Sequence, residues 1–234
     1  MAEYIEGLVR ALCEGNIAAK AAAAHALRDL KGSPVYCMSQ CIAEDGGIPP
    51  LIELLQDGSA ESKVEAAEIL GYLAHYVDAH AVAIADYGGV PPLVDLLRDG
   101  SADAKESAAA ALQSLAYHNA ANILLIVEAG SIPLLVDLLR DGTSMKAKWE
   151  AAGALESLAR NNDANAVAIA ATIGIEALVQ LARRGEVTVN NQWVVPNAAL
   201  PAERKAALVV AALLGDSVPD SVPREVKALI GAYL

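Results

Sequence analysis

The amino-acid sequence predicts an all-α protein in which about five three-helix units stack into a solenoid. The first observation is a repeated segment: residues 89–100 read GVPPLVDLLRDG, and close variants stand at 47–58 and 131–142. The Asp-Gly pairs that end these segments begin at positions 57, 99 and 141, a spacing of 42 residues. A period of this length is typical of helical solenoids, whose units bury their apolar faces against neighbouring units.

The composition agrees with closely packed helices. Apolar residues make up 55% of the 234 positions, whereas Phe is absent and only 2 Trp and 7 Tyr are present. The core is therefore expected to be aliphatic and rich in Ala. The formal net charge is −12, from 29 acidic and 17 basic residues, and the sequence shows no basic stripe. Because such a surface repels polyanions, we expect no nucleic acid partner.

Targeting signals and cysteine usage favour an intracellular protein. The N-terminus lacks the basic and apolar regions of a signal peptide. The most apolar window, 164–181, is interrupted by a Gly turn and a Glu, so it predicts two amphipathic helices and no membrane span. The three cysteines, Cys13, Cys37 and Cys41, are too few for a disulfide framework and indicate a reducing compartment. We expect a cytoplasmic location, with the nucleus as the alternative.

The chain begins inside a unit. Residues 1–15 match the second helix of later units, and Glu14-Gly15 stands where those units have Asp-Gly. A third helix is predicted at 20–30, and its Ala-rich pattern recurs at 63–73, 105–115 and 148–158. Since no first helix precedes 1–15, we expect an uncapped N-terminal repeat, which offers a surface for self-association.

A short first helix precedes each later second helix. These helices are predicted at 79–88, 121–130 and 164–174, with another that ends near residue 46. Gly commonly follows the end of a helix, and Pro suits the first turn of the next one because its missing N–H has no partner there. Each first helix carries an Ile at the same place and ends at a Gly. These residues are Ile42, Ile84, Ile126 and Ile169, and Gly46, Gly88, Gly130 and Gly174.

One unit is therefore a short helix, a Gly, a Pro-started helix, an Asp-Gly turn and a long helix. The pattern Gly-Ile/Val-Pro-Pro-Leu-Val-Asp/Glu-Leu-Leu, then Ala-Ala-x-Ala-Leu-x-x-Leu-Ala, resembles the armadillo repeat. It is closer to the armadillo arrays of plant and protist proteins than to those of nuclear-import adaptors. The resemblance covers the whole chain, most clearly 47–174. It implies a right-handed superhelix forming a single domain, with units at about 1–46, 47–88, 89–130, 131–174 and 175–234.

The fifth unit departs from this pattern. An inserted loop at about 186–200 is apolar and β-branched, and it contains Trp193. Long structured loops in compact domains are often functional. A last helix at 224–234 is predicted to cap the C-terminus.

In armadillo proteins that this chain resembles, the third helices line a concave face that binds extended peptides. Nuclear-import adaptors place a Trp and, one turn later, an Asn there in successive repeats. This sequence has neither series, so the resemblance does not imply a receptor for nuclear-localisation signals. The Trp-type positions hold His25, Glu68, Ala110, Gly153 and Leu208, and the Asn-type positions hold Asp29, Tyr72, Ser114, Ser157 and Ala212.

A floor of small residues between bulkier side chains remains on that face. We predict a partner-binding site bounded by Tyr72 and Trp149, covered by Trp193, with negative charge from Glu68 and Glu106. The alternative is that the small residues only allow tight helix packing and Trp149 fills a gap. The predicted partner-binding residues are Glu68, Tyr72, Glu106, Ser114, His118, Trp149, Ser157, Asn161 and Trp193.

Metal binding and catalysis are disfavoured. Cys37 and Cys41 share one helical face and His25 lies a helix away, but sister repeats carry apolar residues at the two cysteine positions. Buried structural cysteines are therefore favoured over a metal site. His75 and His118 have no nucleophile, oxyanion donor or cofactor motif near them. We expect no catalytic residue, no metal ligand and no cofactor.

The sequence therefore predicts a non-catalytic intracellular scaffold. A protein or peptide segment would lie along the concave third-helix face, and the acidic charge of the chain favours a basic segment. The alternative is a small-molecule-binding or catalytic protein of the same fold that uses a shallow pocket on that face. Fold alone does not decide between the two.

Overall fold

The computed structural model describes residues 2–30, 41–142 and 144–160, together with 162, 164, 165, 168, 169 and 172. Within these residues every regular element is an α-helix. Successive groups of helices follow one another along the described part of the chain. The helices are α1 (Ala2–Glu14), α2 (Ile17–Asp29), α4 (Ile48–Asp57), α5 (Ala60–Tyr76), α6 (Asp78–Asp86), α7 (Val90–Asp99), α8 (Ala102–Ala116), α9 (Ala120–Glu128), α10 (Ser131–Asp141) and α11 (Met145–Ala159).

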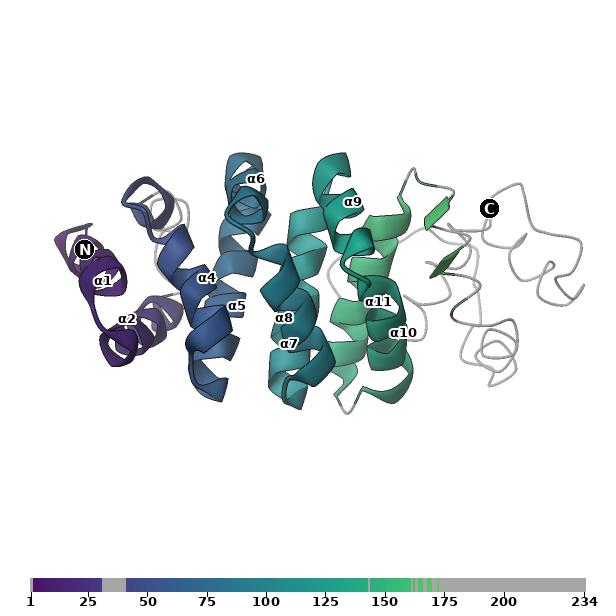
Figure 1. The fold of residues 1–234 in the computed structure, drawn as a ribbon, viewed down its shortest axis with the longest axis horizontal. Helices are drawn as coiled ribbons and strands as arrows, with labels where there is room; N and C mark the ends of the chain where they lie inside the picture. Colours follow the sequence, from purple (N-terminus) through teal and green to yellow (C-terminus); the bar gives the residue numbers. More distant parts are fainter. Residues whose placement is uncertain are drawn as a thin grey trace, which may run out of the picture.

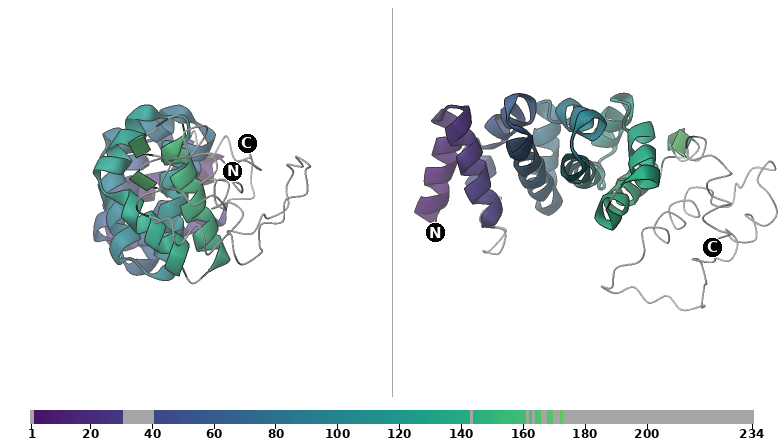
Figure 2. Two further views of the ribbon diagram at one scale, coloured as in Figure 1. Left: turned by 90° about the vertical axis from the view of Figure 1, so that its right-hand side faces the viewer. Right: turned by 90° about the horizontal axis from the view of Figure 1, so that it is seen from below.

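The helices stand in layers along one long axis (Figure 1, Figure 2). The long third helices α2, α5, α8 and α11 pack against one another in chain order, and we call the side that they form the third-helix face. The second helices α1, α4, α7 and α10 form a parallel row in which each contacts the next. This arrangement confirms the helical solenoid predicted from the sequence period.

Helix boundaries follow from short local signals. Gly46, Gly88 and Gly130 have φ angles of 80°, 78° and 79°, the left-handed conformation that Gly adopts without steric cost, as predicted. Each third helix from α5 onward begins at a Ser whose side chain accepts a hydrogen bond from a backbone N–H of the first turn. Pro49 and Pro50 occupy the first turn of α4.

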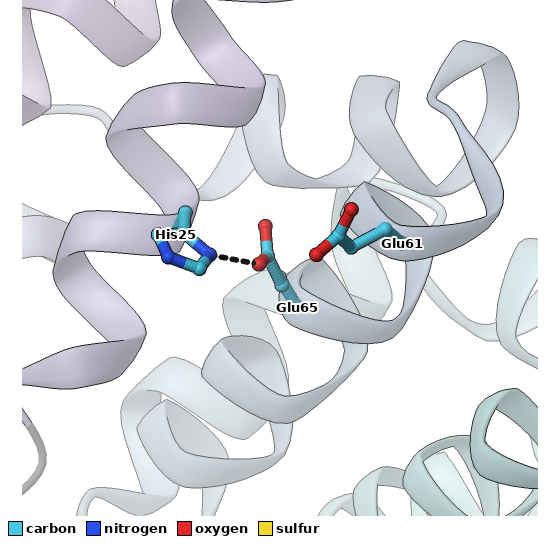
Figure 3. Close-up of side chains that lie close together, drawn as sticks. All are labelled: His25, Glu61 and Glu65. Carbon is cyan, nitrogen blue, oxygen red and sulfur yellow. Dashed lines mark hydrogen bonds and ion pairs between the residues drawn. The ribbon is translucent and has the colours of Figure 1, made fainter.

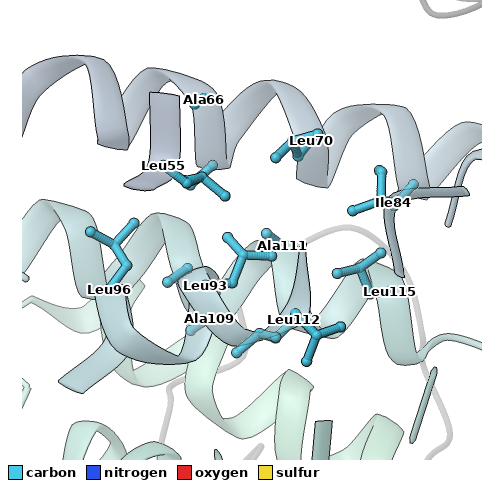
Figure 4. Packing of buried hydrophobic residues seen from close by; sticks show 14 of the residues in the cluster. Leu55, Ala66, Leu70, Ile84, Leu93, Leu96, Ala109, Ala111, Leu112 and Leu115 are labelled. Atoms are coloured by element: carbon cyan, nitrogen blue, oxygen red, sulfur yellow. The ribbon is translucent and has the colours of Figure 1, made fainter. Parts of the chain in front are cut away.

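The core is continuous from layer to layer and consists of aliphatic side chains and Ala. The four repeated Ile residues are all fully buried, as their periodicity indicates: Ile42, Ile84, Ile126 and Ile169. Figure 4 shows Leu112 and Leu115 of α8 together with Leu93 of α7 and with Ala109 and Ala111 of α8 itself. Ala lets the third helices approach closely, and Leu fills the space between the two rows.

Several predicted features lie outside the described residues: Cys37, the loop at 186–200 and the helix at 224–234. Cys13 is exposed, and Cys41 is half-buried against the core. The exposed Tyr4 of α1 lies at the N-terminal end, where self-association stays a prediction. In the described part of the chain no single helix has the length and apolarity to cross a membrane, although α9 and α10, bent by 80°, pass that test as a pair.

Candidate functional site

A cavity lies on the third-helix face between α5 and α8. Its volume is about 320 Å³, near the lower end of the range of roughly 300–1,000 Å³ that ligand pockets occupy. It is open to solvent, so its shape suits one side chain of a partner better than a whole enclosed ligand. The lining residues are Ala67, Glu68, Gly71, Tyr72, His75, Tyr76, Glu106, Ser107, Ala110, Ala111, Ser114 and Lys146.

The floor of this cavity depends on the close approach of α5 to α8. A Cβ added at Gly71 would lie 2.9 Å from the Ala111 Cα and 3.2 Å from its Cβ, so only Gly fits there without movement. The small side chains of Ala110 and Ser114 extend the floor along α8. These residues leave a hollow where larger side chains on both helices would have filled the space.

The cavity wall on α5 is aromatic. The Tyr72 and Tyr76 rings have centroids 4.8 Å apart and an interplanar angle of 60°, and His75 meets Tyr76 edge-on at 5.0 Å. Burial, with a smaller contribution from Tyr76, raises the pKa of the Tyr72 phenol, so this group is neutral at physiological pH. The Tyr72 hydroxyl is buried without a hydrogen-bond partner among the described residues. It can therefore donate to or accept from a ligand.

The opposite wall is acidic, and one cation of the chain already occupies its edge. Lys146 Nζ donates to Glu106 Oε1 at 2.7 Å, and Ser144 Oγ donates to Glu106 Oε2 at 2.8 Å. The hydrogen bond to Glu106 raises the pKa of the Lys146 ammonium, while partial burial opposes this, and the negative charges of Glu150 and Glu68 add to the increase. The electrostatics of the cavity therefore favour a positive charge.

The structure brings four of the predicted site residues together: Glu68, Tyr72, Glu106 and Ser114 all line this cavity. Three others lie elsewhere. His118 is exposed beyond the end of α8, with a φ of 54°; Trp149 is half-buried on α11; and Ser157 is buried, donating to Gly153 O at 3.0 Å. Asn161 and Trp193 lie outside the described residues.

Sequence analysis missed Lys146 as a neighbour of Glu106. The signal was present, because Lys146 stands at the repeat position that Glu61 and Asp103 hold in the two preceding units. A change from acidic to basic at one register position alters the charge of one layer only. Tyr76 and His75, which also line the cavity, were not among the predicted partner-binding residues.

Stacked helical layers with an acidic, aromatic cavity on one face define the chain as a helical-repeat solenoid with a candidate binding surface. The family model of the Armadillo/beta-catenin-like repeat matches residues 38–75, 78–117 and 119–160, about half of the sequence. The chain belongs to this armadillo repeat family. No curated protein matches it.

Solved structures agree with this assignment. An engineered protein is 31% identical with a TM-score of 0.74, and the match covers 97% of this chain but only 51% of that one. A computationally designed armadillo repeat protein for modular peptide recognition is 24% identical with a TM-score of 0.72, covering 89% of this chain and 81% of that one. A designed armadillo repeat protein in complex with the peptide (KR)4 is 22% identical with a TM-score of 0.72, covering 98% of this chain and 99% of that one. At these identities the last two matches show the fold alone.

Proposed function

We propose that the chain is a non-catalytic scaffold that binds a basic peptide segment on the third-helix face, with one Lys or Arg side chain in the cavity between α5 and α8. The observation that carries this proposal is the Lys146–Glu106 ion pair, since it places an ammonium group of the chain itself at the cavity edge. The net charge of −12 would also attract a basic segment from a distance. The complex of a designed relative with (KR)4 supports the choice of peptide.

The cavity offers a bound cation two kinds of contact. The Glu68 and Glu106 carboxylates can accept charge-assisted hydrogen bonds, which are stronger than neutral ones. The Tyr72 and Tyr76 rings can contact the apolar stem of the side chain or interact with its charge through their faces. A Lys or Arg side chain would use both contacts, whereas an acidic side chain would be repelled.

Binding of a fluorescent (KR)4 peptide, measured by fluorescence polarisation, tests the proposal. We expect the Glu68→Gln/Glu106→Gln variant to bind at least about tenfold more weakly, because a hydrogen bond to a charged group contributes roughly 1.5–3 kcal/mol. The Glu3→Gln/Glu128→Gln variant removes the same net charge from two exposed sites on α1 and α9, and its affinity should change little. If both variants lose the same affinity, the peptide is attracted only by the overall charge of the chain, and the cavity is not its binding site.

Replacing Lys146 should have the opposite effect. We expect Lys146→Met to tighten (KR)4 binding several-fold, because it releases the Glu106 carboxylate from its resident ammonium. Lys63→Met, on α5 and outside the cavity lining, changes the net charge equally and controls for long-range attraction. If Lys146→Met weakens binding, or both variants tighten it equally, Lys146 does not compete with the peptide.

A further inference from the structure

A second cluster of ionisable groups lies on the same face, one layer nearer the N-terminus. His25 of α2 faces Glu61 and Glu65 of α5, and their candidate ligand atoms all lie within 4.8 Å of one another. Figure 3 shows the His25 ring directed at the Glu65 carboxylate, with the Glu61 carboxylate beside it. These three residues line a cavity of about 210 Å³, so a small ion with its water would have room there.

Helix geometry places two of the three groups on the same side of α5. Glu61 and Glu65 are four residues apart in α5, so their side chains lie on one face of the helix. Only 3% of the Glu65 side chain is exposed, and its carboxylate contacts His25 of α2. The Glu61 side chain is exposed and has freedom to change rotamer. The cluster thus combines a rigid carboxylate with an adjustable one.

The second nitrogen of His25 also has a suitable neighbour. His25 Nδ1 lies 2.6 Å from Glu65 Oε1, and His25 Nε2 lies 3.6 Å from Asp29 Oδ2. A histidine that binds a metal through one nitrogen usually donates its other N–H to a carboxylate, which fixes the ring orientation and the tautomer. The Asp29 carboxylate is the neighbour that could accept this hydrogen bond when Nδ1 faces the ion, but at 3.6 Å it must first move closer to Nε2.

Arg28 is the cation that now shares this cluster. Its Nη1 lies 3.0 Å from Glu65 Oε1 and its Nη2 lies 3.1 Å from His25 Nδ1. Arg28 Nη1 and His25 Nδ1 both contact Oε1 of Glu65. Neither of these two contacts uses the other oxygen of the Glu65 carboxylate, Oε2. Arg28 also pairs with Asp29 at 3.2 Å and keeps that partner if a metal ion takes its place near Glu65.

We propose that His25, Glu61 and Glu65 form a three-ligand site for Zn²⁺ that bridges two neighbouring repeats. Zn²⁺ accepts both imidazole nitrogen and carboxylate oxygen as ligands and can hold water in the fourth position, whereas Mg²⁺ and Ca²⁺ prefer oxygen ligands alone. Tetrahedral coordination with bonds of about 2.0–2.1 Å places ligand atoms about 3.4 Å apart. A rotamer change of the exposed Glu61 side chain can bring its oxygen within that range.

Charged side chains from both helices surround His25. The charged groups that face His25 are Glu61 and Glu65 from α5 and Arg28 and Asp29 from α2. Only the neutral imidazole binds a metal ion, so the coordinating nitrogen of His25 must be free of its proton when Zn²⁺ is bound.

Isothermal titration of the full chain with Zn²⁺ alone tests the site. We expect one Zn²⁺ per chain, with affinity lowered about tenfold or more in Glu61→Gln and in His25→Gln, a loss at least as large as removal of an outer partner of a metal ligand causes. Glu61 is exposed, so Glu61→Gln should fold normally. His75→Gln, an exposed histidine on α5 outside the cluster, is the matched control and should bind as the wild type does.

The cysteines are the competing ligands and need their own control. A variant with Cys13, Cys37 and Cys41 all replaced by Ser should keep the site, and Co²⁺ bound in place of Zn²⁺ should show no thiolate charge-transfer absorption. Unchanged affinity in Glu61→Gln and His25→Gln, or loss of binding in the cysteine-free variant, would overturn the proposal. Absence of Zn²⁺ binding to the wild type at pH 7.5 would overturn it too.

Discussion

The Leu112→Ala variant is expected to lose about 2–5 kcal/mol of unfolding free energy, the range measured for large-to-small changes in well-packed cores. Leu112 is 1% exposed and lies in the middle of α8, which packs against α5 on one side and α11 on the other. Truncation would leave a cavity between layers that neither neighbouring helix can fill without moving. Because each layer of a solenoid depends on its neighbours, the loss should spread beyond one unit.

Urea unfolding followed by circular dichroism at 222 nm measures this effect. Leu124→Ala is the matched control, since the same chemical change at a side chain that is 58% exposed should alter stability by less than about 0.5 kcal/mol. The midpoint is the safer readout, because repeat arrays do not always unfold in two states. If both variants unfold at the wild-type midpoint, Leu112 does not occupy a tightly packed core position.

Much of the fold could be predicted because the repeat period reports the same environment several times. One buried Ile is weak evidence, but Ile42, Ile84 and Ile126 at one register position indicate a helix face that every layer buries. The glycines that end the first helices were predictable for the same reason. Repetition averages out the single-residue ambiguity that limits a sequence without repeats.

The candidate site was less predictable because it arises where the repeats differ. The register comparison predicted that Glu68 and Tyr72 lie on one face of the third helices, and both line the cavity. The Lys146–Glu106 pair, by contrast, joins residues 40 positions apart in different layers. Likewise, the approach of His25 to Glu65 depends on side-chain rotamers across two helices, which a register comparison does not contain. The partner-binding role of the predicted residues stays a prediction that the peptide experiment addresses.

The sequence analysis also did not predict an asparagine hydrogen bond that occurs in two layers. Asn122 Nδ2 donates to Leu115 O at 2.9 Å and to Ala81 O at 3.1 Å, so this buried side chain of α9 joins α8 and α6. Asn165 Nδ2 donates to Leu158 O at 2.8 Å, one layer further along. The Asn119 N–H donates to Ala116 O, so it does not continue the helical hydrogen bonds to Leu115 O. Asn122 therefore supplies this carbonyl with a donor.

The Asn122→Ala variant is expected to lose about 2–3 kcal/mol of unfolding free energy, because two buried hydrogen bonds disappear and Leu115 O loses its side-chain donor. Urea unfolding measures the loss, and hydrogen exchange of the α8 and α9 amides should accelerate first. A stability equal to that of the wild type would show that water replaces the amide, and the contact would then not hold these layers together.

His80 provides the reverse experiment, because it stands at the repeat position of Asn122 in the preceding unit. Its Nδ1 is buried without a hydrogen-bond partner among the described residues, so this layer lacks the contact that Asn122 and Asn165 make. His80→Asn should therefore raise the unfolding free energy by about 0.5–1.5 kcal/mol, the usual net contribution of one hydrogen bond. His80→Ala, which removes no hydrogen bond, should cost less than about 1 kcal/mol. Urea unfolding midpoints test this prediction too. If His80→Asn loses as much stability as Asn122→Ala, the amide does not reach a carbonyl in this layer. The repeats would then not be equivalent at this position.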